Sequence, residues 1–226
     1  MTVTSEPKYL KRKVFLVDDH PLVREWLTNL INQQKDLEVC GEAESAPQAL
    51  AAMAAAKPDV AVVDLSLKDS SGIELIKNLK QCHPGVAVLV LSMHDESLYA
   101  ERALRAGARG YIMKRETAKK VVTAIRQVLE GKLCVSETIA AAMAEKFVGG
   151  RPSASESPFA LLSDRELEVF QLLGQGRETR QIADDLRISL KTVQAYCDRI
   201  KGKLNLASAT ELRREAVRWE EQRHRI

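Results

Sequence analysis

Short, uninterrupted apolar runs alternate with amphipathic stretches through the first half of the chain. The apolar runs cover residues 14–17, 60–63, 86–91 and 111–113, and residues 37–43, which include Glu38 and Glu42, predict a further strand. Runs of this length without polar alternation are typical of strands buried on both faces, as in a parallel sheet. The stretches between and after them carry apolar residues at helical spacing, at 21–34, 46–56, 72–82, 96–106 and 117–130. Five strands alternating with five helices predict a doubly wound α/β domain with a five-stranded parallel sheet.

Strand signals end after residue 130. The alanine-rich stretch 136–148 favours one more helix, and residues 149–158 are rich in Gly, Pro and Ser and have no periodicity. Such composition is typical of a linker. The remaining patterns are helical only, and we expect four helices there, including a longer one at 190–204. The chain therefore predicts an α/β domain followed by a small all-α domain.

Two helix starts have the sequence of a capping box. Ser45 and Gln48 are three residues apart at the start of the second helical stretch, and Ser163 and Glu166 have the same spacing after the linker. In a capping box each side chain bonds the backbone N–H of the other residue. We expect both boxes to form.

Composition narrows the class of protein. Hydrophobic residues make up 45% of the chain and charged residues 29%, as in ordinary globular proteins. The net charge of +3 is small, so any DNA affinity depends on the local placement of charge. Cys40, Cys82 and Cys197 lie among apolar-periodic residues, which predicts buried thiols and a reducing compartment. No signal peptide or membrane span is recognisable, so we expect a soluble, cytoplasmic protein without a membrane partner.

Polar side chains follow four of the five predicted strands, at the point where each strand ends. Asp18 and Asp19 follow the first strand, Asp64 the third, Ser92 the fourth and Lys114 the fifth. The carboxyl ends of parallel strands meet at one edge of the sheet, where ligands bind. We therefore expect three carboxylates, a hydroxyl and an ammonium to converge in one cleft.

This set of groups suits phosphoryl chemistry. Clustered carboxylates repel one another unless they bind a cation, and hard oxygen ligands favour Mg²⁺. The Asp64 carboxylate could attack a phosphoryl donor, while Mg²⁺ and Lys114 offset charge on the transferred group and Ser92 donates a hydrogen bond to it. His20 and His94 flank the cleft, and we interpret both as polar loop residues.

The same residues carry a family resemblance. Residues 12–131 resemble the flavodoxin-like receiver domain of bacterial two-component response regulators, which has the same groups after the same strands. The resemblance implies Asp64 as the phosphorylated aspartate, with a sensor histidine kinase as the phosphoryl donor. It implies Asp19, Asp64 and the carbonyl of Ser66 as direct Mg²⁺ ligands, with Asp18 acting through water. Receivers catalyse their own phosphorylation and dephosphorylation without being dedicated enzymes.

The resemblance also points to a switch. Tyr111 matches the aromatic residue whose rotamer accompanies movement of Ser92. An ordinary core aromatic is an equally good interpretation of Tyr111 from the sequence.

Residues 159–222 resemble the helix-turn-helix domain of the NarL/FixJ (LuxR-type) regulators. The matching residues are Leu162, Ser163, Arg165, Glu166, Glu168, Val169, Gly176, Gln181, Ile182, Ala183, Leu186, Ile188, Ser189, Thr192, Val193, Ile200, Lys203, Leu204 and Glu211. In the helix at 190–204, Val193, Cys197, Ile200 and Leu204 form an apolar stripe. The opposite face is polar, as in a helix that reads base edges in the major groove.

DNA contacts are expected along this helix. The candidates are Lys191, Thr192, Gln194, Ala195, Tyr196, Asp198, Arg199 and Lys201. Thr192 and the amides of the helix N-terminus can hold a phosphate. The stretch 191–203 carries four basic residues and one acid. An amphipathic bundle helix with a solvated outer face would show the same periodicity.

Several residues depart from the family pattern. Gln194, Tyr196 and Ala209 replace residues that are usual in the family, and Glu178 with Thr179 replaces a Ser-Asn pair. Asp198 lies on the expected DNA side, where it repels phosphate unless it accepts a hydrogen bond from a cytosine amino group. The DNA-binding class is unaffected, but base preference does not transfer from the family.

The sequence therefore predicts a phosphorylation-dependent transcriptional regulator. It has a receiver at 12–131, a linker with a helix at 132–158 and a DNA-binding domain at 159–222. Its expected partners are a sensor histidine kinase and double-stranded promoter DNA, and we expect a homodimer after phosphorylation. The alternatives are a receiver-controlled adaptor that binds proteins and, less favoured, a Mg²⁺-dependent phosphohydrolase. The phosphohydrolase usually has Asp-x-Asp after its first strand, whereas Asp18 and Asp19 are adjacent.

Overall fold

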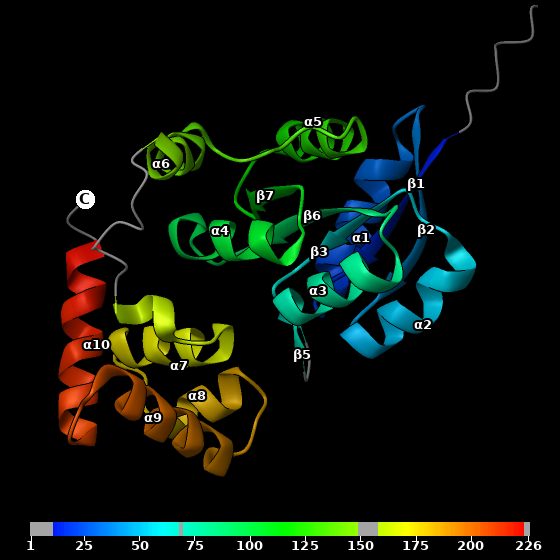
Figure 1. Ribbon diagram of the computed structural model, residues 1–226. Helices are drawn as coiled ribbons and strands as arrows, with labels where there is room; N and C mark the ends of the chain where they lie inside the picture. Colours follow the sequence, from blue (N-terminus) through cyan, green and yellow to red (C-terminus); the bar gives the residue numbers. More distant parts are fainter. Residues whose placement is uncertain (1–10, 68–69, 149–157, 224–226) are drawn as a thin grey trace, which may run out of the picture. The chain divides into compact units, whose positions relative to one another are not determined.

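The chain folds into two compact units that divide after residue 145. The computed structural model describes residues 11–67, 70–148 and 158–223 (Figure 1). The predicted linker at 149–158 lies outside these residues except for its last position.

The first unit is built on a five-stranded parallel sheet with the order β2-β1-β3-β6-β7. The strands are β1 (Arg12–Val17), β2 (Leu37–Ala43), β3 (Val60–Val63), β6 (Ala87–Ser92) and β7 (Gly110–Met113). Every neighbouring pair is parallel. The predicted sheet is therefore confirmed, and β1, β3, β6 and β7 end side by side at one edge.

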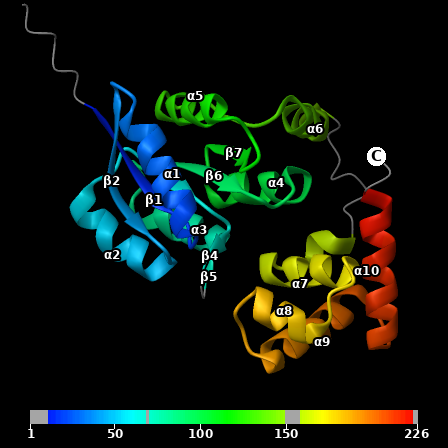
Figure 2. The same cartoon turned by 180° about the vertical axis from the view of Figure 1, so that it is seen from behind.

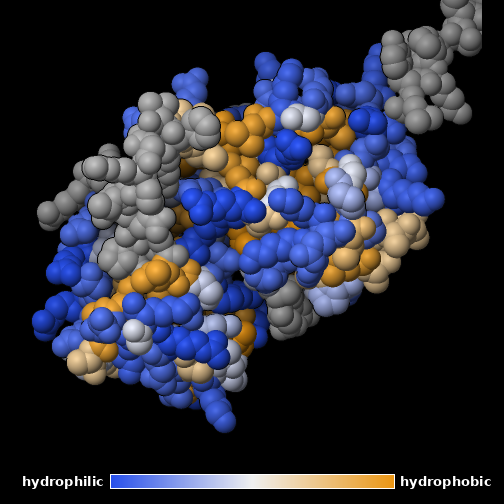
Figure 3. Space-filling view, in the orientation of Figure 1, coloured by the Kyte–Doolittle hydropathy of each residue, from blue (hydrophilic) through white to orange (hydrophobic). Residues whose placement is uncertain are grey.

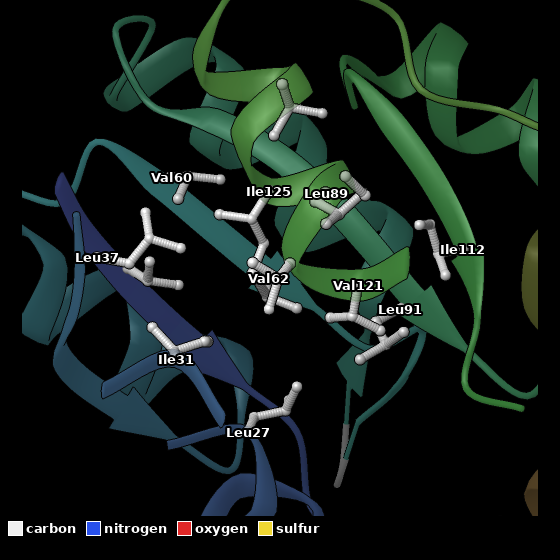
Figure 4. Packing of buried hydrophobic residues seen from close by; sticks show 14 of the residues in the cluster. Leu27, Ile31, Leu37, Val60, Val62, Leu89, Leu91, Ile112, Val121 and Ile125 are labelled. Atoms are coloured by element: carbon white, nitrogen blue, oxygen red, sulfur yellow. The ribbon is translucent and has the colours of Figure 1, made fainter. Parts of the chain in front are cut away.

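Five helices cover the two faces of this sheet (Figures 1 and 2). They are α1 (Pro21–Asn32), α2 (Ala46–Ala56), α3 (Gly72–Cys82), α4 (Glu96–Ala106) and α5 (Ala118–Leu129). Helices α1 and α5 pack on one face, where Leu27, Ile31, Val121 and Ile125 meet the strands (Figure 4), and α2, α3 and α4 cover the other. Burial of each apolar side chain contributes about 1.5–3 kcal/mol to folding.

The second unit is all-helical, as predicted. After α6 (Glu137–Val148), the short 3-10 helix η1 (Pro158–Leu161) leads into α7 (Asp164–Gly174), α8 (Thr179–Asp185), α9 (Leu190–Leu204) and α10 (Ala209–Arg223). Phe170 from α7 and Trp219 from α10 lie 5.5 Å apart between ring centroids, and both contact Phe159. These rings join η1, α7 and α10.

The visible surface is mainly hydrophilic, with smaller apolar patches between the charged side chains (Figure 3). In the part of the chain that the structure describes, no helix combines the length and apolarity needed to cross a membrane.

One predicted capping box and the predicted burial of three cysteines need correction. The capping box at Ser163 and Glu166 forms, but Ser45 makes no side-chain cap, and Gln48 accepts a hydrogen bond from the N–H of Glu44 instead. Cys82 is exposed because it is the last residue of α3, beyond that helix's core-facing positions, and Cys40 and Cys197 are only partly buried.

The sequence also did not indicate a short hairpin. Strands β4 (Ser66–Leu67) and β5 (Ser70–Ser71) pair antiparallel between β3 and α3. Each has two residues, which is too short for a periodic pattern to be recognised.

Gly72 directly follows the hairpin, and only glycine fits at this position. A Cβ at Gly72 would lie 2.3 Å from the carbonyl oxygen of Asp64 and 2.6 Å from the Cα of Leu65. Both are backbone atoms, so they cannot move aside as a flexible side chain would. Helix α3 therefore begins directly against the backbone at the end of β3.

We expect Gly72→Ala to lower the free energy of unfolding by about 1–3 kcal/mol because of this overlap. Gly85→Ala is the matched control: a Cβ there would meet nothing within 4 Å, so its effect should stay within about 0.5 kcal/mol. Thermal unfolding followed by circular dichroism measures both, and equal shifts in the two variants would contradict the overlap.

A buried carboxylate in the second unit depends on a lysine of α9. Glu166 is only 3% exposed, and its Oε2 lies 2.6 Å from Lys203 Nζ, which also donates to the carbonyl of Leu161 at 3.1 Å. Burial raises the pKa of Glu166, but the hydrogen bonds from Lys203 and Ser163 outweigh it, and the pKa is lowered overall. Lys203 therefore faces the fold and does not belong to an outward basic face.

We expect Lys203→Met to destabilise the second unit at neutral pH by about 1–3 kcal/mol, because Glu166 would be left charged without its partner. A lowered pKa in the folded state gives stability that is present above the unfolded value of about 4.3 and is lost as the pH falls through the folded value. The difference from the wild type should therefore shrink below about pH 4.

Urea unfolding at several pH values tests this expectation in a Trp26→Phe background, so that Trp219 fluorescence reports the second unit. The exposed Arg180, changed to Met, is the control for loss of a surface cation. A pH-independent difference between Lys203→Met and the wild type would refute the role of Glu166.

Candidate functional site

The carboxyl ends of β1, β3 and β7 bring acidic side chains together around one lysine. Lys114, directly after β7, places its Nζ 2.6 Å from Asp18 Oδ2 and 2.7 Å from Asp64 Oδ2. These carboxylates follow β1 and β3, and Ser92 is the last residue of β6. The structure thus brings together the residues for which the sequence predicted a common cleft.

The charged groups of this cluster are buried, so each one affects the pKa of its neighbours. Asp18 and Asp64 are each 3% exposed. Burial opposes the charged form of Lys114, but the two carboxylates outweigh it and raise the pKa of Lys114. Burial also raises the pKa of Asp64, against the opposing effect of the Lys114 ammonium. The ammonium therefore holds two buried carboxylates together.

One oxygen of Asp64 remains unused. Its Oδ2 accepts the hydrogen bond from Lys114, whereas Oδ1 is buried and forms no hydrogen bond with the described residues. A buried acceptor without a partner costs about 1–3 kcal/mol and is rare in folded proteins. This oxygen is therefore a candidate atom for binding a ligand.

The acidic pair has partners that the sequence did not reveal. His20 Nδ1 lies 2.6 Å from Asp19 Oδ1 and 3.3 Å from Asp18 Oδ1. Arg24, one turn into α1, donates to the carbonyl oxygen of Asp18 at 2.6 Å. Our interpretation of His20 as a simple polar loop residue was thus incomplete. A usable signal was its position directly after the acids, with Arg24 four residues later.

The donor set fits a divalent cation. Asp18, Asp19, His20 and Asp64 each offer a ligand atom, and these atoms lie within 4.8 Å of one another. Carboxylate oxygens are the ligands that Mg²⁺ prefers in proteins. The unpartnered Oδ1 of Asp64 is the kind of atom that such an ion would satisfy.

Hydrogen bonds of His94 connect the loops after β3 and β6 beside the acidic residues. His94 Nε2 lies 2.8 Å from Ser66 Oγ, and the N–H of His94 donates to Ser92 Oγ at 3.3 Å. The Tyr111 hydroxyl donates to the carbonyl oxygen of His94 at 2.7 Å. Burial raises the pKa of Tyr111, against a hydrogen bond with Ser92, so this phenol is a neutral donor. His94 is a loop residue, as expected, but it links both loops.

In the second unit, α9 has the expected two faces. Val193 and Ile200 are fully buried, with Cys197 and Leu204 partly buried beside them. Four of the candidate DNA contacts are exposed: Lys191, Gln194, Asp198 and Arg199. The other four are partly buried: Thr192, Ala195, Tyr196 and Lys201.

Several of these side chains already have partners. Ser189 caps α9 by accepting from the N–H of Thr192 at 3.0 Å, and the two hydroxyls lie 2.7 Å apart. The Arg199 guanidinium lies 5.5 Å from the centre of the Tyr196 ring. Lys201 Nζ lies 3.0 Å from Asp198 Oδ1.

Two family models match the chain, one for each unit. The model for the response regulator receiver domain matches residues 14–126. The model for bacterial regulatory proteins of the luxR family matches residues 160–216.

Individual relatives match along most of the chain. The oxygen regulatory protein NreC of Staphylococcus epidermidis is 34% identical over 205 residues, which cover 88% of this chain and 94% of the relative. The DNA-binding transcriptional activator DevR/DosR of Mycobacterium tuberculosis is 36% identical over 199 residues, which cover 88% of this chain and 91% of the relative.

Solved structures agree with these matches. A LuxR-family two-component response regulator from Aurantimonas is 36% identical with a TM-score of 0.56, covering 61% of this chain and 99% of that one. A structure of two RcsB dimers bound to two parallel DNAs is 25% identical with a TM-score of 0.55, covering 90% of this chain and 97% of that one.

These matches agree with the geometry of both units. Members of the matched family are DNA-binding regulators, not dedicated enzymes, and they receive their phosphoryl group from a histidine kinase. The chain belongs to the LuxR-type response regulators and is a phosphorylation-dependent transcriptional regulator with a receiver domain and a DNA-binding domain.

Proposed function

We propose that Asp64 accepts the phosphoryl group. The observation that carries this proposal is its Oδ1, which is buried in the cleft and has no hydrogen-bond partner among the described residues. Asp18, the other carboxylate beside Lys114, receives hydrogen bonds from the backbone N–H of His20 and from Lys114. Asp64 thus has an oxygen available for attack, while Lys114 holds its second oxygen and fixes the orientation of the carboxylate.

Mg²⁺ is the proposed cofactor of this site. Asp19, Asp64 and the carbonyl of Ser66 would hold it directly, and Asp18 would act through water. When bound, it supplies positive charge beside the transferred phosphoryl group. Lys114 adds a second positive charge from the β7 side.

Ser92 and Tyr111 are the proposed switch. Ser92 is fully buried at the end of β6, and its Oγ accepts a hydrogen bond from the N–H of His94, whose carbonyl oxygen accepts from the Tyr111 hydroxyl. If Ser92 turns to donate to a phosphoryl oxygen, the His94 loop that holds Tyr111 is free to move with it. Phosphorylation would in this way shift an equilibrium between two receiver states.

The output is DNA binding through α9. We assign the receiver to residues 12–131, the linker to 132–158 and the DNA-binding domain to 159–222, in a cytoplasmic protein. Lys191, Gln194 and Arg199 are exposed on the outer face of α9 and can reach phosphates and base edges. The phosphorylated state should favour a homodimer on promoter DNA, as suggested by the similar RcsB structure, in which dimers bind DNA.

We expect Asp64→Asn to abolish labelling by acetyl phosphate in the presence of Mg²⁺, because the amide is a poor nucleophile. Glu74→Gln, which removes an exposed carboxylate on α3, should label like the wild type. The readout is the mass of the intact protein, which rises by one phosphoryl group. Undiminished labelling of Asp64→Asn would reject Asp64 as the acceptor.

We expect Lys191→Ala to weaken binding to all DNA sequences and to reduce the salt slope of binding by about one, because one phosphate contact is lost. Lys119→Ala, an exposed lysine on α5, removes the same charge from the receiver and should leave the slope unchanged. Fluorescence anisotropy with a labelled duplex across a salt series measures both. An unaltered slope in Lys191→Ala would exclude the phosphate contact.

A further inference from the structure

The outer face of α9 carries a single acid among three basic residues. Asp198 is that acid, and the basic residues are Lys191, Arg199 and Lys201, since Lys203 lies against Glu166. The Asp198 side chain is 73% exposed. It follows Lys191 by seven residues, close to two helical turns, and therefore lies on the same face. A carboxylate on this face repels phosphates, so it lowers affinity for DNA in general.

The residues beside Asp198 on α9 are small, so they do not cover its carboxylate. Ala195 and Gly202, three residues before and four after, are small, and a Cβ at Gly202 would meet nothing within 4 Å. Lys201 Nζ contacts Asp198 Oδ1 at 3.0 Å. Since a carboxylate accepts several hydrogen bonds and this side chain is 73% exposed, Asp198 keeps acceptor capacity for a further donor.

We propose that Asp198 selects a cytosine in each half-site of the operator by accepting a hydrogen bond from its N4 amino group. This inference rests on the proposed role of α9 as the recognition helix. An ionised carboxylate can only accept. In the major groove, cytosine presents a donor, whereas guanine and thymine present acceptors, and adenine places its N7 acceptor beside its N6 donor. The carboxylate therefore attracts cytosine and repels the alternatives.

The proposal explains why an acid is placed on a surface that binds a polyanion. Specificity is a difference of affinities, and a group that penalises wrong partners raises it even while it lowers general affinity. The Lys201 contact partly offsets the charge of Asp198 and holds the carboxylate at the helix surface. Lys201 is accordingly a positioning residue for Asp198.

Selection from a randomised duplex library tests the proposal with the full-length protein, treated with acetyl phosphate and Mg²⁺. We expect the wild type to select cytosine at one position per half-site, by roughly tenfold or more. Asp198→Asn should change that preference to adenine, because asparagine pairs with N6 and N7 of adenine. Asp198→Ala should lose the preference at this position alone and bind non-specific DNA more tightly.

Glu221→Gln is the control, because it removes a negative charge from α10 and should leave every base preference unchanged. Identical base preferences in the wild type and both Asp198 variants would overturn the proposal while leaving DNA binding intact. A uniform loss of affinity without any change in base preference would also overturn it, since that indicates a structural role. Failure of the folded wild type to bind or select any duplex would instead overturn the proposed function of α9 itself, and the cytosine contact with it.

Discussion

The ammonium of Lys114 between Asp18 and Asp64 is the contact on which the receiver depends. Two carboxylates this deeply buried repel each other, and removing the partner of a buried charge costs about 3–5 kcal/mol. The contact at 2.6 and 2.7 Å requires β1, β3 and β7 to end at the same edge of the sheet. The parallel register of the sheet supplies that alignment. The same arrangement leaves one oxygen of Asp64 without a hydrogen-bond partner in the described part of the chain. The contact that stabilises the fold therefore also leaves an acceptor atom available to a ligand.

The cleft was predictable because it is determined by strand ends. Apolar runs such as 60–63 identify a buried strand, and the residue that follows it must lie at the carboxyl edge of the sheet. Asp64 and Lys114 are fifty positions apart in the chain, yet both satisfy this rule. The start of α9 was predictable for a similar reason, because Ser189 caps the helix from a position that the sequence already marks.

The sequence did not reveal contacts that depend on the conformation of a loop. The β4–β5 hairpin has too few residues for a pattern, although Gly72 must pass within van der Waals distance of the Asp64 carbonyl. The bond between His94 and Ser66 joins two loops whose approach no periodicity encodes. Lys203 was counted only as one of the four basic residues in 191–203, but its ammonium lies against the buried Glu166, 37 positions away in the chain.

The partners of the α9 cations limit what this helix can offer to DNA. Lys203 binds Glu166, Lys201 binds Asp198, and Arg199 lies over the Tyr196 ring. Among the residues that the structure describes, Lys191 is the α9 cation that has neither an ion pair nor a ring contact. Because phosphate contacts supply most non-specific affinity, each α9 helix that enters the groove adds only a few such contacts of its own. Two helices held on one operator add their contacts, so dimer formation raises the affinity without any new contact within a single helix. Dimer formation is therefore a step through which a receiver can control DNA binding.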